Sequence, residues 1–182
     1  DLTEKGLDLI KEFEGCKLKA YLCPAGKPTI GYGATYYKDG TKVKLGDTIT
    51  QEEADELLHW MIENEYESYV KKAVTSKINP YQSDALTSFA YNCGTGNLKK
   101  STLLKEVNNN PSDPTIADEF AKWNKSKGKV LAGLTRRRKA ETKLYFTEWV
   151  ELEPEPEPEL EKPKTLTGYL QSEGIKPDNI RK

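Results

Sequence analysis

Three side chains between positions 14 and 29 could carry out acid–base chemistry together, namely Glu14, Cys23 and Thr29. A carboxyl group in a partly apolar cleft has its pKa raised by desolvation, which suits it to donate a proton near neutral pH. Such a donor, facing polar groups that orient a water molecule, is the arrangement that hydrolyses a glycosidic bond. The alternative is that Glu14 is a solvated acid at a helix end and Cys23 a small core residue.

The element that carries Glu14 is predicted to be an amphipathic helix. Apolar residues recur near helical spacing from Leu2 to Phe13, Thr3 is suited to the N-cap, and Gly15 is placed to end the helix. Glu14 then lies in the last turn, where the helix macrodipole disfavours a negative charge. A residue that breaks such a local rule is a candidate for function.

Residues 18–46 are predicted to form a small antiparallel sheet that presents Cys23 and Thr29. Runs typical of strands occupy 18–22, 29–33 and 42–45. Asp39-Gly40 favours a hairpin turn between the later two runs.

The chain after residue 47 is predicted to be helical. Thr50 and Glu53 match a capping box that opens a helix to about residue 72, and Asn79-Pro80 opens a helix that Gly94 ends. Further helices are expected to start near three hydroxyl residues, Ser101, Thr115 and Thr135. The predicted fold class is α+β, with an N-terminal helix and a small antiparallel sheet packed against a mainly helical C-terminal lobe and a cleft between them.

The composition changes sharply near residue 148. Residues 148–182 carry nine acidic and five basic side chains, so 1–147 has a net charge of +3 and suits an anionic polymer. We predict a domain at 1–147, an extended Glu/Pro linker at 148–164 and a short tail at 165–182. The tail could dock on the domain, open a further module or be disordered.

The counts of certain residue types exclude several kinds of site. Three cysteines and one histidine, in 182 residues, fit neither a disulfide scaffold nor a zinc or multi-histidine metal site, so we expect no metal and no cofactor. His59 is expected to be a partly packed helix residue. The first residues do not resemble a signal peptide, and the missing initiator Met suggests a trimmed chain.

The segment from Glu14 onward resembles a known family. Glu, eight residues, Cys or Asp, five residues and Thr form the catalytic signature of the phage-type lysozymes, the endolysins of glycoside hydrolase family 24, and here the signature reads Glu14, Cys23, Thr29. The resemblance covers roughly residues 3–147. It continues through Gln82, then Ser88-Phe89-Ala90-Tyr91-Asn92-Cys93-Gly94-Thr95-Gly96, then Ser101-Thr102-Leu103-Leu104, then Gly133-Leu134-Thr135-Arg136-Arg137-Arg138 and Glu141.

The resemblance implies a muramidase, which hydrolyses the β-1,4 bond between N-acetylmuramic acid and N-acetylglucosamine and lyses bacteria. Glu14 would be the general acid, and Thr29 would help to hold the attacking water. Cys23 stands where many relatives have Asp, and a thiol of ordinary pKa is mostly protonated at neutral pH. We therefore interpret Cys23 as positioning water, in an inverting mechanism.

Four further residues are candidates for substrate binding. Tyr32, Gln82 and Asn92 have aromatic and amide groups that suit a carbohydrate cleft, and the resemblance implies a role for Arg137 near the glycan cleft. The basic run that contains Arg137, residues 136–139, could also be a nucleic-acid patch or, more simply, a solvated helix face.

The expected partner is the peptidoglycan glycan strand, with no nucleic acid, no membrane span and a monomeric chain. We expect synthesis in the host cytoplasm and action on the cell wall. A second hypothesis remains open, a weakly active or inactive wall-binding or structural phage component that retains the lysozyme fold. This hypothesis rests on Cys23, which stands where many relatives have Asp.

Overall fold

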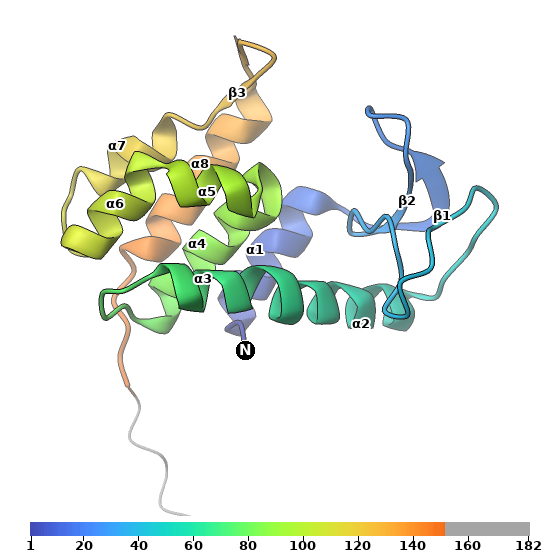
Figure 1. Ribbon diagram of the computed structural model, residues 1–182, viewed down its shortest axis with the longest axis horizontal. Coiled ribbons are helices and arrows are strands. Elements are labelled where there is room, and N and C mark those ends of the chain that lie inside the picture. Colours follow the sequence, from blue (N-terminus) through green and yellow to red (C-terminus); the bar gives the residue numbers. More distant parts are fainter. Residues whose placement is uncertain (152–182) are drawn as a thin grey trace, which may run out of the picture. The chain divides into compact units, whose positions relative to one another are not determined.

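The computed structural model describes residues 1–151, of which Asp1–Trp149 form one compact unit. The predicted tail, and all but the first four residues of the predicted linker, lie outside the described residues. Within the compact unit, the small sheet lies on one side of the N-terminal helix α1 (Glu4–Glu14), and most of the other helices lie on its other side (Figure 1). The fold class is α+β, as predicted.

Helix α1 (Glu4–Glu14) begins and ends at the residues that the sequence predicts. The Thr3 hydroxyl accepts a hydrogen bond from the Gly6 amide at 3.2 Å, which satisfies one of the free amides of the first turn. Gly15 ends the helix with φ 65°, a conformation that glycine adopts without strain. These caps fix Glu14 as the last residue of α1.

The sheet has two strands, β1 (Lys17–Leu22) and β2 (Pro28–Gly31), which pair antiparallel with Tyr21 opposite Thr29. The prediction of a third strand at 42–45 is wrong, because Lys42 makes only an isolated bridge to Tyr36. The Lys44 amide instead donates to the Asp47 carboxylate at 3.0 Å, which holds this part of the chain in a turn.

A long helical segment follows the sheet: α2 (Gln51–Met61), a π-helical turn η1 (Ile62–Glu67) and α3 (Ser68–Ala73). Its start at the Thr50 capping box and its extent agree with the predicted helix. The π-helical turn at its centre was not predicted. The segment runs from beside the sheet to the helical lobe (Figure 1). His59 is exposed on α2, so it is not the partly packed residue expected.

The helical lobe is built on α4 (Pro80–Cys93), which has the predicted Asn79 cap and Gly94 end. The other helices are α5 (Thr95–Lys100), α6 (Thr102–Asn109), α7 (Ile116–Ala121) and α8 (Ala132–Tyr145). Helix α5 was not predicted, and α8 starts earlier than expected.

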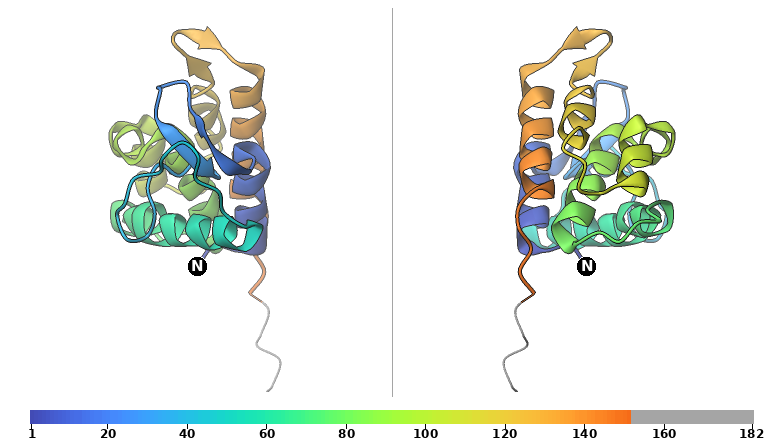
Figure 2. Two further views of the ribbon diagram at one scale, coloured as in Figure 1. Left: turned by 90° about the vertical axis from the view of Figure 1, so that its right-hand side faces the viewer. Right: turned by 90° about the vertical axis from the view of Figure 1, so that its left-hand side faces the viewer.

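The expectation that the chain is helical throughout after residue 47 is wrong at one place. A short hairpin, β3 (Lys125–Ser126) with β4 (Lys129–Val130), projects from one end of the lobe (Figure 2). Lys127 and Gly128 have positive φ angles of 50° and 79°, which reverse the chain between the two strands.

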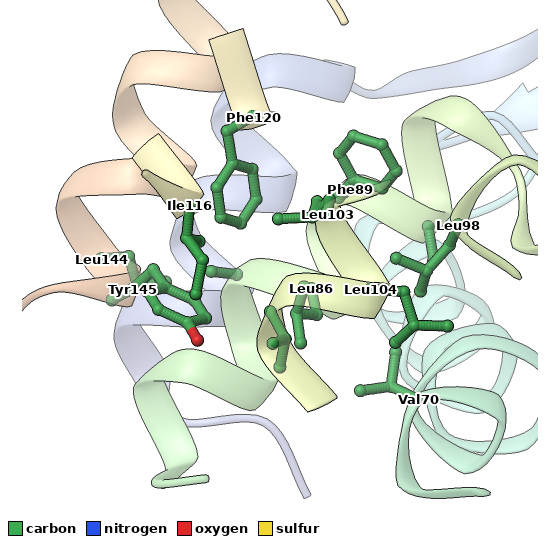
Figure 3. Packing of buried hydrophobic residues seen from close by; sticks show 13 residues of the cluster. Val70, Leu86, Phe89, Leu98, Leu103, Leu104, Ile116, Phe120, Leu144 and Tyr145 are labelled. Carbon is green, nitrogen blue, oxygen red and sulfur yellow. The ribbon is translucent and has the colours of Figure 1, made fainter. Parts of the chain in front are cut away.

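The main hydrophobic core lies inside the helical lobe, where α4 packs against α8 and α5 to α7 pack around it (Figure 3). Phe89 is fully buried, with its ring edge-on to Phe120 at a centroid distance of 6.0 Å. Burial of such side chains contributes about 2 kcal/mol each. Because α4 also contacts α1, this rigid core holds the α1 helix that carries Glu14.

Asp84 on α4 gives the fold a pH dependence. Burial raises the pKa of its carboxyl to about 6, although hydrogen bonds from Thr3 oppose the shift. A folded-state pKa above the unfolded value means that the folded protein binds the proton more tightly. Stability is therefore expected to fall as the pH rises from about 4 to 6. Urea unfolding at several pH values checks this, and Asp84→Asn should flatten that part of the profile; an unchanged profile would contradict it.

Candidate active site

Glu14 forms an ion pair with an arginine 123 positions further along the chain. Its Oε1 accepts a hydrogen bond from Arg137 Nη1 on α8 at 2.6 Å. The Glu14 side chain is 20 % exposed and that of Arg137 is 4 % exposed. This ion pair was not predicted from the sequence, which led us to expect a partly apolar cleft around Glu14. The cation offsets the repulsion that a carboxylate meets at a helix C-terminus.

The second carboxylate oxygen of Glu14, Oε2, faces the turn that follows β2. A Cβ atom at Gly33 would lie 3.6 Å from this oxygen and 3.8 Å from the Tyr91 hydroxyl, and the φ angle of Gly33 is 100°. The Tyr91 hydroxyl donates to the Tyr32 carbonyl oxygen at 2.7 Å, which ties α4 to this turn. Burial raises the pKa of Tyr91, and the charge of Glu14 raises it further.

The β1–β2 hairpin brings Cys23 and Thr29 together. The carbonyl oxygen of Lys27 accepts from the Cys23 amide at 3.0 Å and from the Thr29 hydroxyl at 2.9 Å. A hydrogen bond from the Lys27 backbone lowers the pKa of the Cys23 thiol, burial opposes this, and a hydrogen bond from the Thr29 hydroxyl lowers the pKa further. The hairpin therefore supplies what an unassisted thiol lacks, a bias toward the thiolate.

Tyr21 on β1 links the hairpin to Glu14. Burial raises the pKa of Tyr21, and the charges of Cys23 and then Glu14 raise it further, so both groups lie within electrostatic reach of one phenol. Glu14 and strand β1 are thus neighbours, joined by Gly15 and Cys16.

A buried ionic cluster lies behind Arg137. Glu141 is fully buried and binds both arginines of α8, with Arg138 Nε at 2.6 Å from Oε1 and Arg137 Nε at 3.4 Å from Oε2. The Ser88 hydroxyl donates to Glu141 Oε2 at 2.6 Å. Burial raises the pKa of the Glu141 carboxyl, against the pull of Arg138 and Arg137. The cluster fixes the position of the guanidinium group that reaches Glu14.

The family model for phage lysozyme matches residues 11–141, which include the Glu14 end of α1, the hairpin and the buried cluster on α8. The chain belongs to the phage lysozyme family. Its residues are 43 % identical, over 149 residues, to an endolysin of Bacillus phage B103, an alignment that covers 81 % of this chain and 54 % of that protein. The chain therefore spans about half the length of that relative.

Two solved structures resemble this chain. The endolysin of Escherichia coli O157:H7 phage FAHEc1 is 38 % identical with a TM-score of 0.73, over 81 % of this chain and 94 % of that one. The muramidase domain of SpmX from Asticaccaulis excentricus is 31 % identical with a TM-score of 0.71, over 81 % and 99 % of the two chains. The family and the lysozyme-like α+β fold inferred from the sequence are thus confirmed.

Two of the residues proposed for substrate binding have other hydrogen-bond partners in the structure. Tyr32 is buried, and its hydroxyl donates to Asp55 at 2.9 Å and accepts from Gln51, with its pKa raised to about 12 by burial and by Asp55. Gln82 caps α4 by accepting from the Asn79 amide at 2.9 Å. Within residues 1–151, neither side chain forms a hydrogen bond with Glu14 or Arg137.

The other two, Asn92 and Arg137, line one polar cavity of about 490 Å³ between α1 and the start of α8. Asn92 is exposed, and its Oδ1 accepts from Arg138 at 2.9 Å. Phe13 lines the same cavity, so a ligand there would meet an aromatic ring, an amide and a guanidinium group. This cavity adjoins the Glu14–Arg137 ion pair.

The simple interpretation of residues 136–139 as a solvated helix face is wrong for two of them. Arg137 and Arg138 are 3 % and 1 % exposed, whereas Arg136 and Lys139 are exposed. This cluster was not predicted from the sequence because the carboxylates that neutralise the arginines lie outside the basic run. They are Glu14 on α1 and Glu141 one turn further along α8. The spacing of Arg137, Arg138 and Glu141 by three and four residues, which places them on one helix face, was the available signal.

Residues 1–151 contain no group of three or more potential metal ligands, and their three cysteines are free. Within the same residues, no helix is both long and apolar enough to cross a membrane.

Proposed function

We propose that this chain is a muramidase that hydrolyses the β-1,4 bond between N-acetylmuramic acid and N-acetylglucosamine in peptidoglycan. The observation that carries the proposal is the Glu14 carboxylate, held at 2.6 Å by Arg137 with its Oε2 toward the turn that follows β2. Family membership and the resemblance to proteins named endolysin and muramidase support it.

In this proposal the two oxygens of Glu14 have different tasks. Oε1 is bound by Arg137, which orients the carboxyl group. Oε2 has no hydrogen-bond partner within residues 1–151 and faces the open turn at Gly33. We assign proton donation to the leaving glycosidic oxygen to Oε2, and we regard Arg137 as a positioning residue.

Thr29 and Cys23 hold the attacking water in this mechanism. The Thr29 hydroxyl can donate to only one acceptor at a time, so a water molecule or the Cys23 sulfur competes with the Lys27 carbonyl for it. The lowered pKa of Cys23 increases its thiolate fraction and thus its capacity to accept a hydrogen bond from water. Attack by water on the face opposite Glu14 inverts the anomeric configuration.

The experiment that tests the function uses purified peptidoglycan. Release of new reducing ends, with an inverted product at early times by NMR on a soluble glycan, is the expected result. A retained product would require a covalent nucleophile and would make Cys23 the suspect. Wall binding without any new reducing ends would contradict the muramidase proposal. It would favour the second hypothesis, a wall-binding or structural component.

The proposed setting follows from the substrate. The chain would be made in the host cytoplasm, act on the cell wall and work as a monomer. Burial of Arg137 and Arg138 leaves no continuous basic face on α8, which supports the proposal that nucleic acid is not a partner. Water is the only reactant needed besides the glycan, so no cofactor or metal is proposed.

Replacement of Cys23 by Asp should keep lytic activity, whereas Cys23→Ser should lower it about tenfold without abolishing it. Asp supplies a charged acceptor for the water, and Ser keeps a weaker one with no lowered pKa. Initial rates of peptidoglycan clearing measure both.

The control for this pair is Cys16→Ser, a half-buried cysteine outside the hairpin turn, which should leave the rate unchanged. If Cys23→Asp were inactive while the wild type is active, the thiol would have a specific role beyond positioning water.

A further inference from the structure

A cavity of about 370 Å³ opens on the sheet side of the molecule, between two loops whose side chains have no role in the proposed mechanism. One wall is the β1–β2 turn, with Lys27, and the other is the loop after β2, with Thr35, Tyr36 and Lys42. Cβ atoms at Gly26 and Gly40, which also line it, would meet nothing within 4 Å. The cavity is therefore open to solvent at these two turns.

Both lysines of the cavity are free of carboxylate partners. Lys27 and Lys42 are exposed, and neither ammonium group has a carboxylate within 4.0 Å in the part of the chain that the structure describes. The Tyr36 hydroxyl is already bonded to Glu65 on η1, so its ring forms a fixed side of the cavity. Two unpaired ammonium groups beside a fixed aromatic ring suit an anion with an organic portion.

The charge of the surrounding segments favours an anion at this place. Residues 17–46 contain six lysines and one aspartate, whereas 47–68 contain eight carboxylates and no lysine or arginine. The six lysines are all exposed. The sheet thus has a positive potential and the α2–η1 segment a negative one, so an anionic polymer is attracted to the sheet and repelled by that segment.

The cavity adjoins the proposed reaction centre through one residue. The backbone carbonyl of Lys27 holds both Cys23 and Thr29, while its side chain lines the cavity. A ligand group in the cavity would therefore contact the residue whose backbone holds Cys23 and Thr29. The sugar rings of a glycan are neutral, so an anion that near the scissile bond must be a substituent of the strand.

We propose that Lys27 and Lys42 form a subsite for an oxyanion substituent of the glycan strand, either a carboxylate of the attached peptide or a phosphate of a linked wall polymer. This rests on the proposed function, because it takes the strand as the substrate. The subsite selects substituted, anionic strands over bare neutral glycan and contributes binding rather than chemistry.

The test measures binding, in a background in which Glu14→Gln prevents digestion of the wall. The Kd for teichoic-acid-containing cell walls is measured by co-sedimentation at near-physiological salt. The double variant Lys27→Gln with Lys42→Gln is compared with the same protein that keeps both lysines. We expect the Kd to rise about five- to tenfold, as the loss of two exposed ion pairs would cause. Lys27→Arg with Lys42→Arg keeps both charges and should restore binding.

The matched control is Lys125→Gln with Lys129→Gln on the β3–β4 hairpin, which removes the same charge from two exposed residues of the helical lobe. Its Kd should change less than twofold. If both double variants raised the Kd equally, the lysines would act by general attraction to the wall, and the subsite proposal would be overturned. An unchanged Kd in Lys27→Gln with Lys42→Gln would also overturn it. Thermal melting shows that each variant is folded.

Walls extracted with hydrofluoric acid, which removes phosphate polymers and keeps the peptides, separate the two sources of the anion. A lysine effect that persists on extracted walls identifies the peptide carboxylate, and one that disappears identifies the phosphate. Because binding needs no hydrolysis, an inactive wild type would refute the proposed function alone. An active wild type with lysine-independent binding would refute only the subsite.

Discussion

The Glu14→Gln variant is expected to lose peptidoglycan lysis by at least about 100-fold, since Gln cannot donate the proton that the leaving oxygen needs. Folding should be nearly unaffected. Gln still offers an oxygen to Arg137, and Arg137 keeps its second carboxylate, Glu141. Loss of the ion pair is offset in part because a charge unfavourable to the α1 macrodipole is removed. Clearing rates and thermal melting of the same preparation measure both effects.

The control for this variant is Asp8→Asn, which removes an exposed carboxylate from the same helix, two turns before Glu14. It should leave the lytic rate unchanged. Activity of Glu14→Gln within a few-fold of the wild type would remove Glu14 as the acid. A large fall in melting temperature would instead mean that the Glu14–Arg137 pair is mainly a structural tie between α1 and α8.

The second large effect is expected at Glu141. In Glu141→Gln, two buried guanidinium groups lose the carboxylate that lies between them, at 2.6 Å from one and 3.4 Å from the other. Breaking a buried ion pair by removing one partner costs about 3–5 kcal/mol. For a domain of this size, the lower figure corresponds to a fall in melting temperature of about 6–12 °C. Calorimetry measures it directly.

The matched control is Glu148→Gln, which removes an exposed carboxylate just after α8 and should leave the melting temperature within about 1 °C. Ser88→Ala, which removes one hydrogen bond to Glu141, should have an intermediate effect of about 1 kcal/mol. A melting temperature of Glu141→Gln equal to that of the wild type would mean that the arginines find other partners and that the cluster does not hold Arg137.

Local sequence patterns predicted the helix ends well because a cap is made by residues within a few positions of one another. Thr3 bonds Gly6, and the Thr50 box closes on Glu53. The prediction of a third strand was wrong because a strand depends on a partner elsewhere in the chain. Its pattern suited a strand, but the Lys44 amide found a nearer acceptor in Asp47, and a strand needs a partner that the local pattern does not specify.

The sequence alone determined the family, the α+β fold class and the spacing of Glu14, Cys23 and Thr29, since these depend on residue types at fixed separations. Only the tertiary structure decided the surroundings of those residues. Arg137 lies 123 positions from Glu14, and a run of four basic residues is hydrophilic whether it is solvated or neutralised. Burial of Arg137 is stable only because Glu141 and Glu14 meet it there, and that meeting depends on the packing of α1, α4 and α8.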